Sequence, residues 1–274
     1  MREVAVSIMT TNVRHLIGLD SFLTNEQSAV ERSLNRFGKL AWERAQWPFC
    51  SVLEQVIPDV RVRSIDVNDA GSGYSSAPAV TISGGSGSGA TASATIDGDG
   101  KVNGISVTAQ GTGYVDEPDV SIAGTATATA NLLAYVDFGT TIADVFSITT
   151  ADPYGNTNPR EIPFRITFES GGSEYGLAAL EGRSSTAPVW VHYRKPWPDY
   201  ASAATDFPYV FSEYATYGAF SDWLIADGQT SRGQVALEQA EAILLTELDK
   251  LERQQRQQTP VRITTYVSST PSPA

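Results

Sequence analysis

Apolar residues recur at helical spacing in three segments of the chain. Val30, Leu34, Phe37 and Ala41 follow a repeat of three to four residues, which predicts an amphipathic helix over about 24–46. Residues 24–27 have the pattern of a capping box, in which Thr24 accepts from a first-turn amide and Gln27 reaches back. We expect this helix to end before the sequence Trp-Pro that follows it, because proline disfavours helix at the residue before it.

Two further helices are expected near the end of the chain. The first covers about 208–226 and the second about 231–257, where Val235, Leu244 and Leu251 belong to one apolar stripe. The last turns of the second helix are polar, basic and rich in glutamine, and nothing there needs to be buried. Residues 261–267 read as an extended arm and the remainder as a tail of small residues.

Other segments alternate apolar and polar residues, which is typical of strands. Residues 189–194 are the clearest strand outside the middle of the chain, and residues 144–148 and 162–168 also read as strands. Residues 174–180 fit either a strand or a short helix. Near the N-terminus, Val4, Val6 and Ile8 alternate weakly, which predicts a short strand or arm.

An internal repeat occupies residues 65–84 and 105–124. Nine residues of the first segment recur forty positions later: Ile65, Val67, Gly71, Gly73, Tyr74, Pro78, Val80, Ile82 and Gly84. Matches at this many positions in one phase indicate duplication of a structural unit. The Gly-x-Gly-Tyr turn permits positive φ at its glycines and then places an aromatic ring against the sheet.

These patterns together predict an α+β protein with a discontinuous domain. Residues 1–61 and 137–260 are expected to form a helical-bundle and β domain. Residues 62–136 are expected to form an inserted all-β domain made of two tandem repeats, and 261–274 a C-terminal arm. A shift in charge supports an insertion: residues 64–159 hold ten acidic residues and one basic residue, Lys101.

Composition narrows the class of function. The 274-residue chain has a net charge of −12, which argues against wrapping nucleic acid. A single cysteine, Cys50, excludes an internal disulfide and a multi-cysteine zinc site, and we expect it to be a small buried hydrophobe. The absence of a secretory signal pattern and of any apolar run near ~20 residues predicts a soluble protein.

The candidate ligand-binding motifs are weak. Residues 97–100, Asp-Gly-Asp-Gly, predict a hairpin turn; they lack the later ligands and the terminal glutamate of a calcium loop. The glycines Gly71 and Gly73 lack the third glycine and the following helix of a dinucleotide site. We therefore expect no cofactor and no metal.

An enzyme is the least favoured class. His192 with Asp152 and a serine is a conceivable triad, but no Gly-x-Ser-x-Gly motif is present. Asp116 and Glu117 imitate a glycosidase pair, yet they lie in a turn of the repeat. We expect no catalytic residues, and a virion-associated hydrolase remains the second alternative.

The duplicated pattern over residues 62–136 resembles small β-modules inserted in virion proteins of tailed phages. This resemblance implies a contact or decoration module. Tyr74 and Tyr114 are its candidate surface residues, since exposed aromatic rings on such units bind glycans or other surfaces. The corresponding first alternative is a carbohydrate-binding or decoration protein of the tail or capsid surface.

The flanking segments resemble the head–tail adaptor, or connector, proteins of tailed bacteriophages. The resemblance rests on the order of elements: an N-terminal helix running into Trp-Pro-Phe, a short β part ending in Val-Trp-Val-His-Tyr-Arg, a helix pair with a glutamine-rich end, and a C-terminal arm. It implies a structural protein of the virion neck, made in the host cytoplasm. Its expected partners are further copies in a ring, usually twelve-fold, the portal protein, a downstream tail or nozzle protein and, transiently, passing double-stranded DNA, but no membrane.

The adaptor resemblance makes the C-terminal region the expected portal contact. The residues concerned are Arg253, Arg256, Val261, Arg262, Ile263 and Tyr266. An extended arm of this kind adds a strand to a partner or docks on it. The acidic balance fits a passage wall that does not hold DNA; alternatively, the acidic insertion faces outward and only confers solubility.

Overall fold

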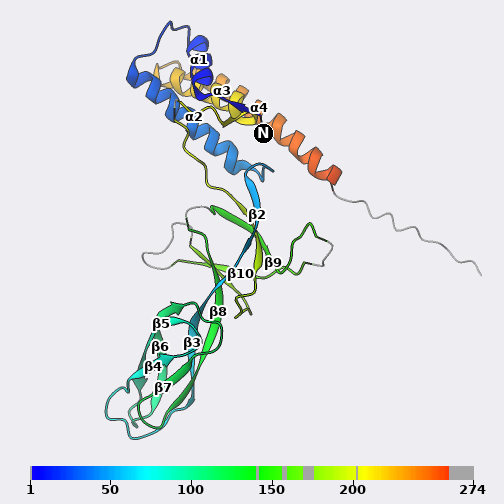
Figure 1. Cartoon of the computed structure of the whole chain (residues 1–274). Coiled ribbons are helices and arrows are strands. Elements are labelled where there is room, and N and C mark those ends of the chain that lie inside the picture. The colour runs from blue at the N-terminus through cyan, green and yellow to red at the C-terminus, as the bar shows by residue number, and fades with distance from the viewer. Residues whose placement is uncertain (1, 140–141, 156–158, 169–175, 202, 259–274) are drawn as a thin grey trace, which may run out of the picture. The chain divides into compact units, whose positions relative to one another are not determined.

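The computed structural model describes residues 2–139, 142–155, 159–168, 176–201 and 203–258, with side chains described up to residue 255. The fold is mixed α+β, with four helices and several antiparallel sheets among these residues. The chain divides into two compact units: Met1–Phe49 with Trp197–Ala274, and Cys50–Pro196. We call them the helical unit and the β unit (Figure 1).

The helical unit contains all four helices. They are α1 (Val6–Ile17), α2 (Thr24–Arg44), α3 (Tyr209–Ala226) and α4 (Thr230–Gln258). A two-stranded ladder joins β1 (Glu3–Val4) to β13 (Phe207–Pro208). The predictions for α2, α3 and α4 are confirmed to within two residues at each end.

Helix α1 corrects the prediction of a strand or arm near the N-terminus. Only Glu3–Val4 is extended, and Val6, Met9 and Val13 form the buried stripe of a helix. Gly18 ends α1 in the left-handed conformation, with φ of 85°. The alternation of Val4, Val6 and Ile8 was too short to distinguish a strand from the first turn of this helix.

The start of α2 also differs from the prediction. Leu23, not Thr24, is the N-cap residue, and Glu26 accepts a hydrogen bond from the Leu23 backbone N–H at 2.8 Å. Leucine has no side-chain acceptor, so only this half of a capping box is formed. Gln27 donates instead to Glu31, one turn along α2.

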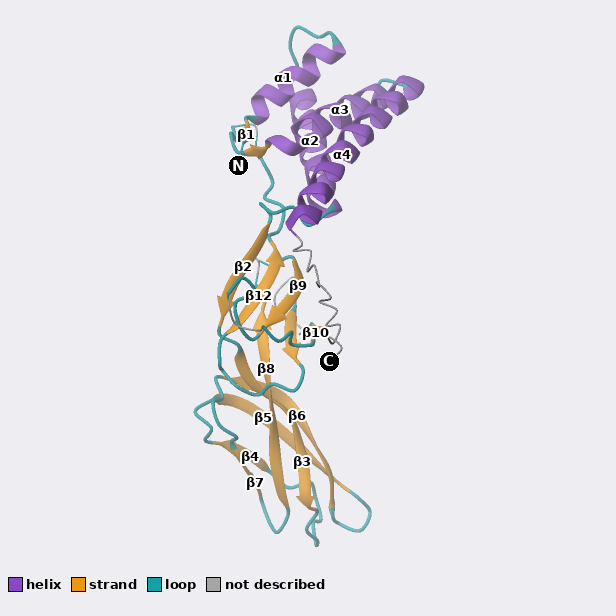
Figure 2. Ribbon diagram, turned by 90° about the vertical axis from the view of Figure 1, so that its right-hand side faces the viewer, coloured by secondary structure: helices purple, strands orange, loops and turns teal. Residues whose placement is uncertain are grey.

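Helix α3 lies at the centre of the helical unit (Figure 2). It approaches α2 closely at Gly218, where an added Cβ would lie 2.4 Å from the Phe37 ring. On another side, the Ser221 hydroxyl donates to the Gly233 carbonyl of α4 at 2.8 Å. Helix α1 packs on a third side of α3, so α3 is flanked by all three other helices.

The β unit contains eleven strands among the described residues. They are β2 (Ser51–Val56), β3 (Asp59–Asp69), β4 (Val80–Ser83), β5 (Ser88–Ile96), β6 (Val102–Thr112), β7 (Asp119–Ile122), β8 (Thr127–Asp137), β9 (Asp144–Thr149), β10 (Phe164–Thr167), β11 (Leu177–Leu180) and β12 (Val189–Arg194). The expected strands over 144–148, 162–168 and 189–194 are confirmed, and the segment 174–180 contains a strand rather than a helix.

These strands form a six-stranded sheet of order β10-β11-β8-β3-β6-β5, a three-stranded sheet β2-β12-β9 and the pair β4-β7. Buried residues of all three sheets belong to one core or pack against it, including Val62 of β3, Val191 of β12 and Ile82 of β4. The sheets therefore pack face to face, and β8 and β11 also bury residues on their other face, where Leu133, Tyr135, Leu177 and Ala179 form a separate cluster.

The expected boundaries of the inserted domain lie inside strands. Positions 61/62 and 136/137 fall within β3 and β8, which pair with each other from Asp59↔Tyr135 to Asp69↔Thr127. Val62 and Ala134 are fully buried in the core that these strands share with β12. The compact β unit therefore begins at Cys50 and ends at Pro196, because the duplicated segment and its neighbours share one sheet and one core.

Candidate docking face of the helical unit

One side of α3 is not covered by any described helix. Tyr209, Glu213, Tyr217 and Phe220 follow one another at spacings of four, four and three residues, which places them on one stripe of the helix. Tyr209 is 43% exposed, and Tyr217 and Phe220 are half-buried. The other sides of α3 are apolar and packed. With this stripe added, α3 carries apolar residues on all its sides.

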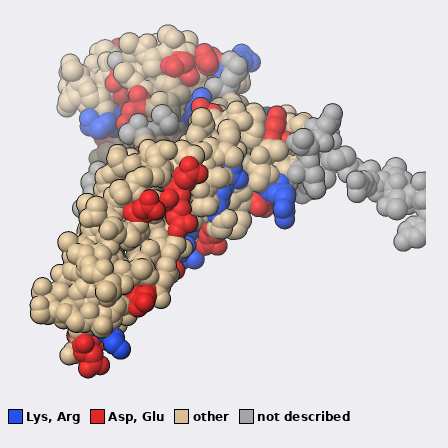
Figure 3. All heavy atoms as spheres, turned by 60° about the horizontal axis from the view of Figure 1, so that its bottom comes forward, with Lys and Arg blue, Asp and Glu red and all other residues tan. Residues whose placement is uncertain are grey.

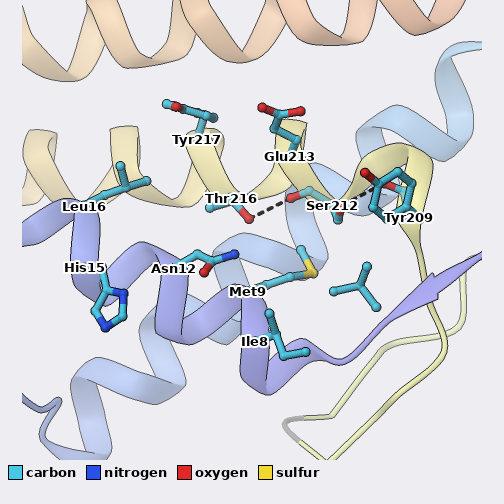
Figure 4. Close-up of a pocket in the computed structure, with 11 residues that line it drawn as sticks. Ile8, Met9, Asn12, His15, Leu16, Tyr209, Ser212, Glu213, Thr216 and Tyr217 are labelled. Carbon is cyan, nitrogen blue, oxygen red and sulfur yellow. Dashed lines mark hydrogen bonds between the residues drawn. The ribbon is translucent and has the colours of Figure 1, made fainter.

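A groove of about 740 Å³ runs between α1 and this stripe. Ile8, Asn12 and Leu16 of α1 and Tyr209, Glu213 and Tyr217 of α3 line it. Figure 4 shows Met9 of α1 and Thr216 of α3 between the two helices. Met9 and Thr216 form its floor and are buried. Ile8 is 55% exposed, so an apolar side chain of α1 stands open to solvent at the groove rim.

A second groove, of about 370 Å³, lies between the same stripe of α3 and α4. Phe220 and Leu224 of α3 meet Val235 and Gln239 of α4 there. Val235 is 55% exposed. The two grooves share the outer stripe of α3, so they belong to one surface made by α1, α3 and α4. We call this surface the aromatic face and define it by Ile8, Leu16, Tyr209, Glu213, Tyr217, Phe220 and Val235.

The electrostatics of the aromatic face centre on two groups. The Arg2 guanidinium lies 4.0 Å from the centre of the Tyr209 ring, which is a cation–π contact. The carboxylate of Glu213 is exposed and forms no hydrogen bond or ion pair within the described part of the chain. Thr216 donates to the Ser212 carbonyl at 2.7 Å, so its hydroxyl is satisfied within α3. The face thus offers aromatic rings and the carboxylate of Glu213, and its second groove is also lined by Arg232, which bonds to Gln229.

The outer side of α2 has the opposite character. Arg32, Arg36, Lys39 and Glu43 lie on it, at spacings that leave the buried stripe of Val30, Leu34, Phe37 and Ala41 on the other side. The Arg36 guanidinium is 2.6 Å from Asp222 of α3, and Lys39 is 4.0 Å from Glu43. Arg32 is exposed and has no such partner among the described residues.

Most of the expected portal-contact residues lie outside the described part. Val261, Arg262, Ile263 and Tyr266 belong to residues 259–274, and the side chain of Arg256 is likewise not described. Arg253 is exposed near the end of α4 and forms an ion pair with Asp249 one turn earlier. The structure therefore places one of the six residues, and their grouping remains an expectation.

The two tyrosines of the repeat are packing residues rather than an exposed binding surface. Tyr114 is 2% exposed and belongs to the core of the β unit. Tyr74 is half-buried, and its hydroxyl oxygen accepts from the backbone N–H groups of Thr125 and Ala126 at 3.0 and 2.9 Å. The Gly-x-Gly-Tyr turns fold the rings inward, which corrects the expectation that they face a ligand.

Of the residues considered for catalysis, His192 lies opposite Ser147 of β9, and its side chain forms no hydrogen bond among the described residues. His192 lies on β12, where its ring meets Phe146 edge-on at 5.0 Å, and burial lowers its pKa. Cys50 is fully buried, as expected. The described residues contain no cluster of three or more histidine, cysteine or carboxylate side chains suited to a metal ion. Within the same residues, no helix combines the length and the apolarity that a membrane span needs.

The turn at residues 97–100 is confirmed as a hairpin connection between β5 and β6. The Asp97 carboxylate accepts from the backbone N–H groups of Asp99 and Lys101 at 3.0 and 2.9 Å. This side chain therefore holds the turn. On the face shown in Figure 3, charged groups of both signs are separated by wide areas of uncharged residues.

Sequence reasoning did not find the aromatic face. Phe211, Tyr214 and Ala215 lie on the packed side of α3, and all three are buried. The sequence feature that could have revealed the aromatic face is the spacing of Tyr209, Tyr217 and Phe220, which places aromatic residues on the side of α3 opposite its packed side. The α1 wall was missed because α1 itself was not predicted.

Comparison with known proteins finds no family model and no curated sequence that matches the chain. The function is therefore inferred from the chain's own residues and geometry.

Proposed function

We propose that this chain is a structural virion protein, a head–tail adaptor that forms a ring between the portal and the tail. Its mechanism is assembly: copies bind side by side, one side of the ring meets the portal, the other meets a tail or nozzle protein, and the genome passes through. The proposal rests on the order of elements, which resembles that of adaptor proteins. In the helical unit, helices α1 and α2 from the N-terminal part of the chain pack with α3 and α4 from the C-terminal part.

The aromatic face is the observation that carries an assembly role. Isolated exposed apolar residues are normal on a soluble protein, but a continuous surface of aromatic and aliphatic side chains marks an interaction site. Tyr209, Tyr217 and Phe220 are residue types that are enriched in protein interfaces and among their energetic hot spots. Both grooves on this face are open to solvent, which favours a protein partner over an enclosed small molecule.

The alternatives lack a comparable feature among the described residues. A carbohydrate-binding role depended on exposed Tyr74 and Tyr114, and both rings pack within the β unit. A hydrolase depended on His192 with a carboxylate and a serine. Ser147 is its cross-strand neighbour, but the His192 ring packs on Phe146 and its side chain forms no hydrogen bond among the described residues. The adaptor remains the function that the surface of the helical unit supports best.

The proposal is tested with the purified chain and the portal protein encoded by the same genome. Electron micrographs of the chain alone and of the mixture should show rings, and ring–portal complexes when both are present. A chain shortened to residues 1–258 should keep its helical signal in circular dichroism and lose portal binding, which tests the expected contacts at 261–266. A chain that stays monomeric with portal present, or that binds or cleaves a polysaccharide instead, contradicts the adaptor role.

A further inference from the structure

We propose that the aromatic face of one copy binds the outer side of α2 of a second copy. This inference rests on the proposed ring and names the two surfaces that build it. Closed rings need heterologous contacts, in which unlike surfaces of one subunit meet the two neighbours. The helical unit offers two such surfaces, and they differ in chemistry and in position.

Helix geometry places the two surfaces on opposite sides of α3. Gly218, which touches the Phe37 ring of α2, follows Tyr209 by nine residues. At about 100° per residue, nine residues correspond to a half-turn beyond two full turns. Tyr209 therefore points away from α2, and the aromatic face and the outer side of α2 bound the unit on opposite flanks. A subunit of a ring has to present its two contacts in this way.

The side chains of the two surfaces are chemically complementary. The aromatic face offers the rings of Tyr209, Tyr217 and Phe220 and the carboxylate of Glu213. The outer side of α2 offers long basic side chains, whose stems cover aromatic rings while their charged ends stay hydrated or pair with a carboxylate. The contact of Arg2 with the Tyr209 ring shows that this face already receives a guanidinium within the chain.

One acidic and one basic residue of these two surfaces have no ion-pair partner within the described part of the chain. On α2, Arg36 is balanced by Asp222 and Lys39 by Glu43, whereas Arg32 has no ion-pair partner among the described residues. On the aromatic face, Glu213 is the acidic residue without one. Opposite charges across an interface fix its register and suppress wrong pairings. Glu213 of one copy and Arg32 of the next are therefore the expected charge pair of this contact.

The test measures the assembly of the full chain by sedimentation and native mass spectrometry over a range of concentrations. Glu213→Lys and Arg32→Glu should each raise the concentration needed for assembly by about tenfold or more, which corresponds to about 1.4 kcal/mol. The double variant, Glu213→Lys with Arg32→Glu, should restore assembly toward that of the original chain. Both residues are exposed, so the thermal unfolding of the monomers should be unchanged.

Two equally exposed apolar residues of α4 allow a test of the aromatic face that does not depend on charge. Val235 and Leu245 are both 55% exposed, but only Val235 lines a groove of the aromatic face. Val235→Asp should weaken assembly and Leu245→Asp should not. A monomeric original chain, equal effects of the two α4 variants, or unchanged assembly in both charge variants would overturn the inference.

The outcomes separate this inference from the proposed function. If substitutions at Glu213, Arg32 and Val235 weaken assembly but the chain does not bind the portal, the proposed contact between copies stands and the adaptor function is refuted. If rings form and bind the portal equally well with all three substitutions, the adaptor function stands and the proposed contact between copies is refuted.

Discussion

Ile65 on β3 lies directly opposite Ile105 on β6 in an antiparallel ladder. The two residues occupy the same position in the two sequence repeats, forty residues apart. Thr81 and Ser121 are likewise repeat equivalents, and they face each other across β4 and β7. Antiparallel pairing of a residue with its own equivalent is what a local two-fold axis produces, so both pairs lie on such an axis.

The outer strands follow the same symmetry. Ile105 pairs with Ala94 of β5, and Ile65 pairs with Ala130 of β8. These two alanines end similar Ala-Thr-rich segments, 90–94 and 126–130, which match at an offset of 36 residues. The β5–β6 ladder and the β3–β8 ladder shift register at corresponding points. In the first the shift lies between Thr91 and Ala92 of β5, and in the second between Val67 and Asp69 of β3. Equivalent sequences thus adopt equivalent pairings, including their irregularities.

The repeat tyrosines lock the two halves together. The Tyr74 ring packs on Gly124 of the second repeat, and the Tyr114 ring packs on Gly87, which follows the first repeat. Their hydrogen bonds differ, since only the Tyr74 hydroxyl accepts from the backbone of residues 125 and 126. Tyr74→Phe should therefore destabilise the β unit by about 1–3 kcal/mol, because two backbone donors lose their acceptor.

Tyr114→Phe is the matched control for this prediction, and it should change stability by less than about 0.5 kcal/mol. Urea unfolding followed by tyrosine and tryptophan fluorescence measures both variants. Equal losses would mean that the hydroxyl of Tyr74 contributes nothing beyond its ring.

The sequence predicted those features that a regular pattern specifies by itself. Helices α2, α3 and α4 and strand β12 follow from spacing, and the duplication follows from matches at one offset. What escaped prediction depends on contacts between distant segments. The shared core of β3 and β12 and the exposed stripe of α3 are fixed by which surfaces meet in three dimensions, and no local pattern encodes that choice.

The close approach of α2 and α3 at Gly218 gives a second prediction. An alanine at Gly218 would favour the helix by about 1 kcal/mol, but its Cβ would overlap the base of the Phe37 ring. Such overpacking costs about 1–3 kcal/mol, so Gly218→Ala should destabilise the helical unit overall. Thermal unfolding followed by circular dichroism at 222 nm measures the change.

A double variant tests the cause of that loss. Phe37→Leu removes the ring that the new methyl group would meet, so Gly218→Ala should cost less in this background than alone. Additive effects of the two substitutions would show that the ring is not what limits the approach of the helices.

The division into units gives a third prediction, in the form of two deletions. The Lys195 backbone N–H donates to the Cys50 carbonyl at 3.0 Å, so the ends of the β unit lie side by side. Replacing residues 50–196 by a Gly-Ser linker of about six residues should leave a folded helical unit. Removing only residues 62–136 should unfold what remains of the β unit, because Val62 and Ala134 leave its core.

Circular dichroism and limited proteolysis distinguish the two deletion proteins. If the chain without 62–136 kept a protease-resistant β part, the original expectation of an independent insert would stand. If the chain without 50–196 lost its helical signal, the two units would depend on each other to fold.

Alkaline pH should destabilise the protein through its buried tyrosines. Burial raises the pKa of Tyr214 to about 12, and the nearby carboxylate of Glu241 adds to the effect. Burial likewise raises the pKa of Tyr193 to about 12, with a further contribution from Glu54. In the unfolded chain a tyrosine ionises near pH ~10, so the folded state binds these protons more tightly.

The sign of the effect follows from that difference. The stabilisation is fully present below about pH 10 and is lost as the pH rises toward 12, because the unfolded chain releases its protons first. The unfolding temperature should therefore fall steeply over this interval, and Tyr214→Phe should flatten the fall. Tyr154→Phe, which removes the hydroxyl of a tyrosine that is 84% exposed, is the control. A fall in unfolding temperature of the same steepness in Tyr214→Phe would show that this hydroxyl is not responsible.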